Sequence, residues 1–60
     1  MKIFEVVHMT YGDYIGHSLY EENHEVVSRF TSKLKADEAL RRLKLENVNE
    51  IYYVREAIVE

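Results

Sequence analysis

Residues 33–44, KLKADEALRRLK, are the stretch that decides the fold. Alanine and leucine recur in it with the spacing i, i+3, i+4 and i+7, which places them on one side of an α-helix. These residues are Ala36, Ala39, Leu40 and Leu43. Thr31 or Ser32 can supply the N-cap, because a hydroxyl oxygen accepts a hydrogen bond from the first helical turn. The stretch therefore predicts an amphipathic helix that ends near Leu45 and buries one face.

Three segments on either side of this helix are rich in β-branched and aromatic residues, which favour strands. Residues 2–9 (KIFEVVHM) and 25–31 (EVVSRFT) precede the helix, and residues 50–59 (EIYYVREAIV) follow it. The first segment has apolar side chains on both faces, so we expect it to be the central strand. In the second segment, simple alternation gives one face to Val26, Ser28 and Phe30. The order β-β-α-β predicts an α+β fold in which a three-stranded antiparallel sheet packs on one helix.

The segment between the first two strands, residues 10–24 (TYGDYIGHSLYEENH), has no clear periodicity. Two structures fit it. Either the flanking strands extend into a long hairpin, or Asp13 caps a short helix over residues 14–20. Gly16 favours the hairpin, because glycine destabilises a helix interior by about 1 kcal/mol relative to alanine.

Length and composition limit the size of the core. Sixty residues, of which 47% are hydrophobic and 12% aromatic, fit one folded domain over residues 1–60. A chain this short buries only about 60% of the surface that its unfolded form exposes, and without cysteine it cannot use disulfides as reinforcement. We therefore expect self-association, in the form of a homodimer, to supply the missing stability.

Several classes of partner are disfavoured. No run of residues approaches the roughly 20 apolar residues of a membrane span, and no signal-peptide cleavage site follows the amino-terminal segment. Together with the absence of cysteine, this predicts a cytoplasmic protein with no membrane partner. The net charge of −3 opposes binding to a phosphate backbone, so nucleic acid is not the expected partner. Arg41, Arg42 and Lys44 could contact phosphates, but cations near the end of a helix also complement its dipole.

Few side chains suggest chemistry. His17 and Ser18 are neighbours, but no glycine-framed nucleophile elbow surrounds the serine. Residues 21–24 (EENH) could hold a cation, although we expect a solvated loop there. We expect His8 to be a strand-end residue with a local hydrogen bond. The sequence therefore predicts no catalytic residue, no metal site and no cofactor, and hence a protein that is not an enzyme.

Tyrosine is the residue type that suggests a function. Three of the five tyrosines, with two aliphatic residues, fall within residues 10–24. Tyrosine offers a large rigid surface with a polar tip and is enriched where protein interfaces gain most of their energy. The predicted partner-binding residues are Tyr11, Tyr14, Ile15, Leu19 and Tyr20. The alternative is that these side chains fold back over the open face of the sheet.

The opening strand that ends in His8, the segment RFTSK (residues 29–33) and the helix ADEALRRLK (residues 36–44) resemble a family of small uncharacterised ββαβ domains of bacteria and their phages. The residues that carry the resemblance are Phe30, Ser32, Ala36, Ala39, Leu40 and Leu43. It implies this fold and a phage-like setting, and it brings no catalytic residue. With the tyrosines, it predicts a phage-type accessory protein that binds a host protein, through residues 10–24 or through an exposed strand edge, and inhibits or modulates it. The alternative is a homodimeric nucleic-acid-binding regulator.

Overall fold

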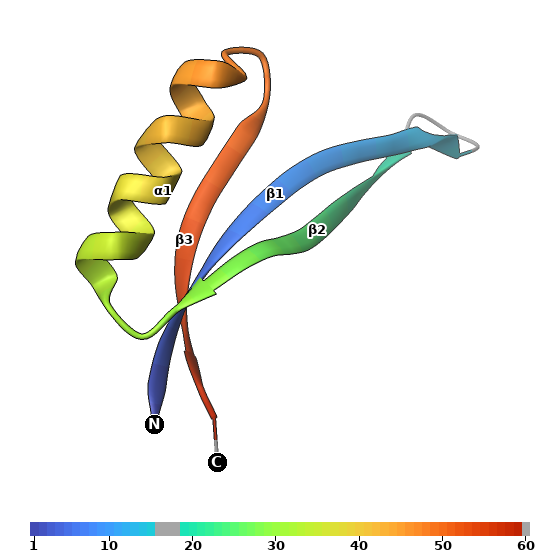
Figure 1. The fold of residues 1–60 in the computed structure, drawn as a ribbon. Helices are drawn as coiled ribbons and strands as arrows, with labels where there is room; N and C mark the ends of the chain where they lie inside the picture. Colours follow the sequence, from blue (N-terminus) through green and yellow to red (C-terminus); the bar gives the residue numbers. More distant parts are fainter. Residues whose placement is uncertain (16–18, 60) are drawn as a thin grey trace.

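The computed structural model describes the backbone of residues 1–15 and 19–59 and the side chains of residues 1–12 and 22–59. The elements are β1 (Lys2–Ile15), β2 (Leu19–Phe30), α1 (Lys33–Glu46) and β3 (Ile51–Ile58). The three strands form an antiparallel sheet in the order β2-β1-β3 (Figure 1). The predicted α+β fold, its β-β-α-β order and the central position of the first strand are confirmed.

The helix follows the predicted boundaries closely. Ser32 is the N-cap, and its Oγ accepts a hydrogen bond from the backbone N–H of Lys35 at 3.4 Å. At the other end, the backbone N–H and the side-chain amide of Asn47 both donate to the carbonyl of Leu43, at 2.9 and 3.1 Å. Ala36 is fully buried, and the other residues of the predicted apolar face are partly buried: Ala39, Leu40 and Leu43. These local signals are sufficient to place the helix.

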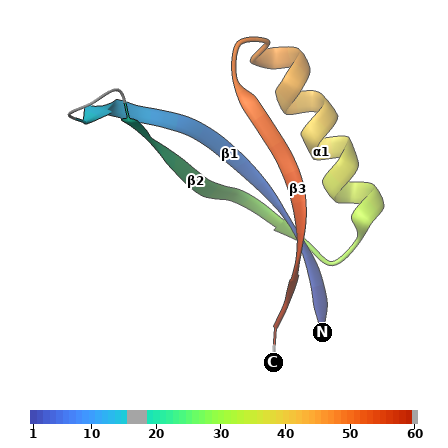
Figure 2. The ribbon, with the colours of Figure 1, turned by 180° about the vertical axis from the view of Figure 1, so that it is seen from behind.

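The sheet has one face that α1 covers and one that it leaves open (Figures 1 and 2). Phe4 and Val6 of β1 lie on the covered face, where Phe4 pairs with Phe30 and Val6 pairs with Val54. Val7 lies on the open face. Even so, it is as fully buried as Val6. Side chains of the neighbouring strands must therefore cover β1 on the face that has no helix.

A β-bulge in β2 changes the alternation that we predicted for this strand. Val6 pairs with Ser28, but Val7 pairs with Val26, so Val27 is an extra residue in β2. Val26 therefore lies on the open face with Val7, opposite to Ser28. The prediction that Val26 and Ser28 share a face is wrong, because a period-2 pattern cannot reveal an inserted residue.

Beyond the end of β3, β1 and β2 continue as a two-stranded ribbon. β3 pairs with β1 as far as Met9 and Ile51, whereas pairing between β1 and β2 continues to Ile15 and Leu19. We call residues 10–15 and 19–23 the arm, which points away from α1 in Figure 1. The long hairpin is thus confirmed over the short helix.

Replacing Ala36 by leucine (Ala36→Leu) should destabilise the fold by about 1–3 kcal/mol, because extra methylene groups have no space where the helix meets the sheet. Leu34→Ala is the control, since Leu34 is 71% exposed and should change stability by about 0.5 kcal/mol or less. Urea unfolding followed by circular dichroism measures both. Equal stability of the two variants would contradict a tight contact at Ala36.

Candidate interaction site

The arm holds the residues that the sequence singled out. Tyr11 lies in β1 opposite Glu22 of β2, and its side chain is 59% exposed. The other four pair with one another along the backbone of the arm: Tyr14 with Tyr20, and Ile15 with Leu19. Their side chains, like the backbone of His17 and Ser18, lie outside the described residues. The topology therefore gathers all five predicted residues on one two-stranded ribbon, and the ring of Tyr11 is not packed against the sheet.

The arm and the adjoining residues of β2 are acidic. Residues 10–25 contain four carboxylates and no lysine or arginine. Two of these carboxylates are described, those of Glu22 and Glu25, and both residues are exposed. All eight lysine and arginine residues lie elsewhere in the chain. On the described part of the arm, the exposed residues Tyr11 and Glu22 lie opposite each other, so an aromatic ring and a carboxylate are close together.

A row of three charged side chains crosses the open face of the sheet. Glu5 of β1 lies directly between Arg29 of β2 and Arg55 of β3. Nε of Arg29 donates to one carboxylate oxygen of Glu5, and Nε of Arg55 donates to the other, both at 2.9 Å. The side chain of Glu5 is 9% exposed, whereas both arginines remain open to solvent. The row joins all three strands where no helix covers them.

The arginines determine the ionisation of Glu5. The hydrogen bond from Arg55 lowers the pKa of the Glu5 carboxyl, and the hydrogen bond from Arg29 lowers it further. Burial acts in the opposite direction, but the net effect is a lowered pKa. The same interaction raises the pKa of Arg55. Sequence reasoning missed this row. Glu5 has apolar residues on both sides in the central strand, which signals a carboxylate that needs partners, but the sequence does not identify those partners.

Residues 21–24 belong to β2 and not to the solvated loop that we predicted. Nδ1 of His24 lies 2.9 Å from the hydroxyl oxygen of Tyr53, with the two rings edge to face. Nε2 of His24 lies 3.5 Å from a carboxylate oxygen of Glu22. The contact between His24 and Tyr53 spans from β2 to β3 across β1, and it helps to explain the burial of Val7.

His8 also has a partner distant in the sequence. Its Nε2 lies 2.8 Å from Oε2 of Glu50, and its ring stacks on Tyr52 at 4.8 Å. We expected a local hydrogen bond, and this expectation is wrong because 42 residues separate His8 from Glu50. The contact ties β1 to the start of β3, which is a structural role.

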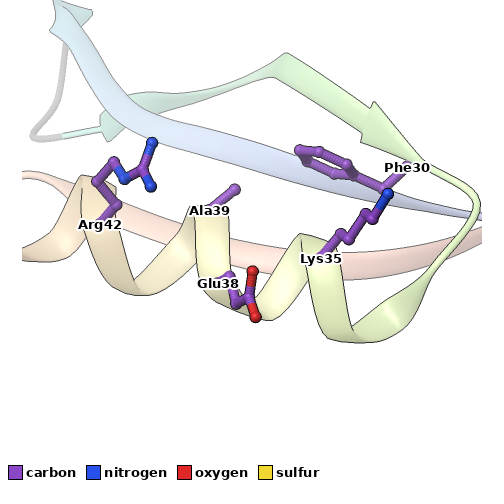
Figure 3. Close-up of a pocket in the computed structure, with 5 residues that line it drawn as sticks. All are labelled: Phe30, Lys35, Glu38, Ala39 and Arg42. Carbon is purple, nitrogen blue, oxygen red and sulfur yellow. The ribbon is translucent and has the colours of Figure 1, made fainter.

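A shallow hollow of about 280 Å³ lies between α1 and the end of β2. Its lining residues are Phe30, Lys35, Glu38, Ala39 and Arg42. Lys35 extends toward Phe30, whereas the carboxylate of Glu38 points the other way (Figure 3). Arg42 is the one member of the predicted basic group in this lining, and Arg41 and Lys44 lie exposed elsewhere on the helix. The volume lies at the lower limit for a small-molecule site, about 300 Å³.

No protein-family model matches the chain, and no curated protein or solved structure is significantly similar to it. The resemblance to ββαβ domains of bacteria and their phages therefore stays a prediction. Within the described residues, no group of three histidine or acidic side chains is arranged to hold a metal ion. Over the same residues, no helix has the length and apolar character needed to cross a membrane.

Replacing Glu5 by glutamine (Glu5→Gln) should lower the urea midpoint at pH 7, because the two guanidinium groups lose the carboxylate that they share. The difference from wild type should shrink as the pH falls. The folded protein lowers the pKa of the Glu5 carboxyl below its ordinary value. Its contribution is therefore complete above that value and is lost as the pH falls through the folded pKa. Urea unfolding between pH 7 and pH 3 measures this.

The control for this experiment is Glu56→Gln. Glu56 lies 3.6 Å from Lys2, and both side chains are exposed. Such a pair contributes little to stability, so Glu56→Gln should follow wild type at every pH. Equal midpoints of Glu5→Gln and wild type at pH 7 would show that the charged row does not hold the strands.

Proposed function

We propose that this protein is a non-enzymatic binding module that attaches to another protein through the arm. The observation that carries the proposal is the ribbon beyond Met9 and Ile51, where β1 and β2 continue without β3 beside them. Tyr11 stands exposed on this ribbon. No other part of the described chain combines projection from the body with an exposed aromatic ring.

The energetics of the arm support this role. An isolated two-stranded hairpin is marginally stable in water, because it has neither a third strand nor a packed face. Keeping its backbone ordered costs about 1–2 kcal/mol per residue. A partner that covers the arm would supply the missing layer and remove the Tyr11 ring from water. The ring gives a rigid anchor of the kind that dominates binding energies.

The charge of the arm indicates the chemistry of the partner surface. The arm contains three carboxylates and no lysine or arginine, which favours a groove that is basic at its rim and apolar at its floor. The same charges oppose a phosphate backbone. Basic side chains on α1, such as Arg41, are the groups from which a nucleic-acid interface would have to be built. The arm therefore favours a protein partner over nucleic acid.

The specific form of this proposal comes from the sequence resemblance. In that form the partner is a host protein, and the chain is a phage-type accessory protein that inhibits or redirects it by occupying a groove. The short chain and the exposed tyrosine agree with such a role. The homodimeric nucleic-acid-binding regulator is the alternative outcome of the same experiment.

Tagged wild-type protein should retain one host protein from a host lysate in near-stoichiometric amount. Tyr11→Ala should reduce the retained amount at least tenfold, because truncating a dominant interface residue costs about 2 kcal/mol or more, which is roughly 30-fold in affinity. Leu45→Ala is the matched control, since Leu45 is 75% exposed on α1 and remote from the arm. Quantitative mass spectrometry measures the retained protein, and circular dichroism verifies that both variants are folded.

Two results would contradict the proposal. One is equal retention by Tyr11→Ala and wild type. The other is capture of nucleic acid in place of protein, with affinity that falls steeply between about 50 and 200 mM salt, which would identify the regulator.

A further inference from the structure

The outer edge of β3, on the side away from β1, exposes backbone N–H and C=O groups. The hydrogen bonds to β1 show which residues carry these groups. The amino group of Met1 donates to the carbonyl of Val59 at 2.9 Å, and the N–H of Val59 donates to the carbonyl of Met1 at 2.8 Å. The two residues are therefore a hydrogen-bonded pair, and such pairs alternate along an antiparallel ladder. Because the register between β1 and β3 is continuous, odd-numbered residues of β3 point their N–H and C=O groups toward β1. The residues that point them outward are Tyr52, Val54, Glu56 and Ile58.

The two edges of the sheet differ in their protection against another strand. β2 has a bulge at Val27 and exposed charges at Glu22, Glu25 and Arg29. Bulges and charges are the devices that hinder edge pairing. β3 also carries two exposed charged residues, Arg55 and Glu56, but it has no bulge, proline or lysine, and its terminal residues Ile51 and Ile58 are 44% and 77% exposed. The bulge is what distinguishes the two edges. The edge of β3 is therefore the one that can accept a further strand.

We propose that this edge pairs with the same edge of a second copy of the chain, antiparallel, about a twofold axis through Val54. Residues that lie directly opposite each other in an antiparallel pair share a face of the sheet. A twofold axis that relates two copies of β3 must therefore pass through a residue and not between two residues. An axis at Arg55 or at Glu56 would set like charges opposite each other, which is destabilising. Val54 is the residue nearest the middle of the strand that avoids this. The product is a continuous six-stranded sheet.

The sequence of β3 is self-complementary about Val54. Arg55 lies opposite the partner's Tyr53, so this axis sets no like charges opposite each other. Glu56 lies opposite the partner's Tyr52, and Ala57 lies opposite the partner's Ile51. Symmetry repeats each pair, as an interface between identical patches requires. A strand of another protein would need a sequence complementary to β3, whereas a second copy of this chain already has one.

The shape of the chain agrees with this pairing. Among the described residues, three hydrophobic side chains are fully buried: Val6, Val7 and Ala36. The chain exposes 4908 Å², whereas a monomeric globular protein of 7.2 kDa exposes about 4,100 Å². The radius of gyration is 13.6 Å, against about 10 Å for a globular chain of this length. The excess surface is similar to the roughly 800 Å² that one partner buries in a standard interface.

Sedimentation of the wild-type protein at about 50 μM should give twice the mass of the 7.2 kDa chain. Glu56→Pro should give the monomer, because proline removes an outward N–H and leaves the hydrogen bonds from β3 to β1 in place. Glu56→Ala is the matched control and should remain dimeric. A wild-type monomer at this concentration overturns the proposal, as does a folded Glu56→Pro variant that stays dimeric.

A single cysteine tests the register, because the natural chain has none. Val54→Cys should form a disulfide-linked dimer under mild oxidation, since residues opposite each other in a hydrogen-bonded pair have Cα atoms about 5.5 Å apart, within the range of a disulfide. Val27→Cys, on the edge of β2, should stay monomeric on a non-reducing gel. Equal cross-linking of the two variants overturns the proposal, and this test does not depend on Glu56→Pro being folded. Neither test involves the arm, so the dimer and the proposed function can fail separately.

Discussion

Val6 and Val7 are adjacent in β1, and both are fully buried although they point to opposite faces of the sheet. Both faces of β1 must therefore be covered, and the other elements provide this cover. On one face α1 covers Val6, and the fully buried Ala36 allows the helix to lie close to the strands. On the other face there is no helix, and cross-strand contacts replace it: the charged row centred on Glu5 and the contact between His24 and Tyr53. A small chain thus uses polar side chains where a larger one would add a layer.

These two means of covering β1 differ in how well the sequence predicts them. The helix depends on local signals, the hydroxyl of Ser32 and the recurring alanines and leucines, so its position and its inner face were predictable. Strand types and order followed from β-branched residues and from the apolar character of both faces of β1. The charged row could not be predicted in the same way, because it depends on which residue of β2 and of β3 lies beside Glu5. That register becomes known only from the paired strands.

The same limit explains the errors around β2. The bulge at Val27 moves Val26 to the other face, and no period in the sequence signals it. The segment that contains His24 looked like a loop because its residues are polar, yet pairing with β1 makes it a strand. The tyrosines were recognised from residue type alone. The length of the hairpin places them on one projecting ribbon, and this common location makes them a candidate site.

The hydrogen bonds between Met1 and Val59 join the two ends of the described chain, and they have a consequence for biosynthesis. Of the four described elements, β1 is synthesised before the others, whereas β3, its second neighbour in the sheet, is synthesised last. During translation the β1–β2 hairpin and α1 can form, but β1 keeps an unpaired side and Val7 lacks the cover of Tyr53. A nascent chain of this design therefore passes through a stage with a bare, aggregation-prone strand.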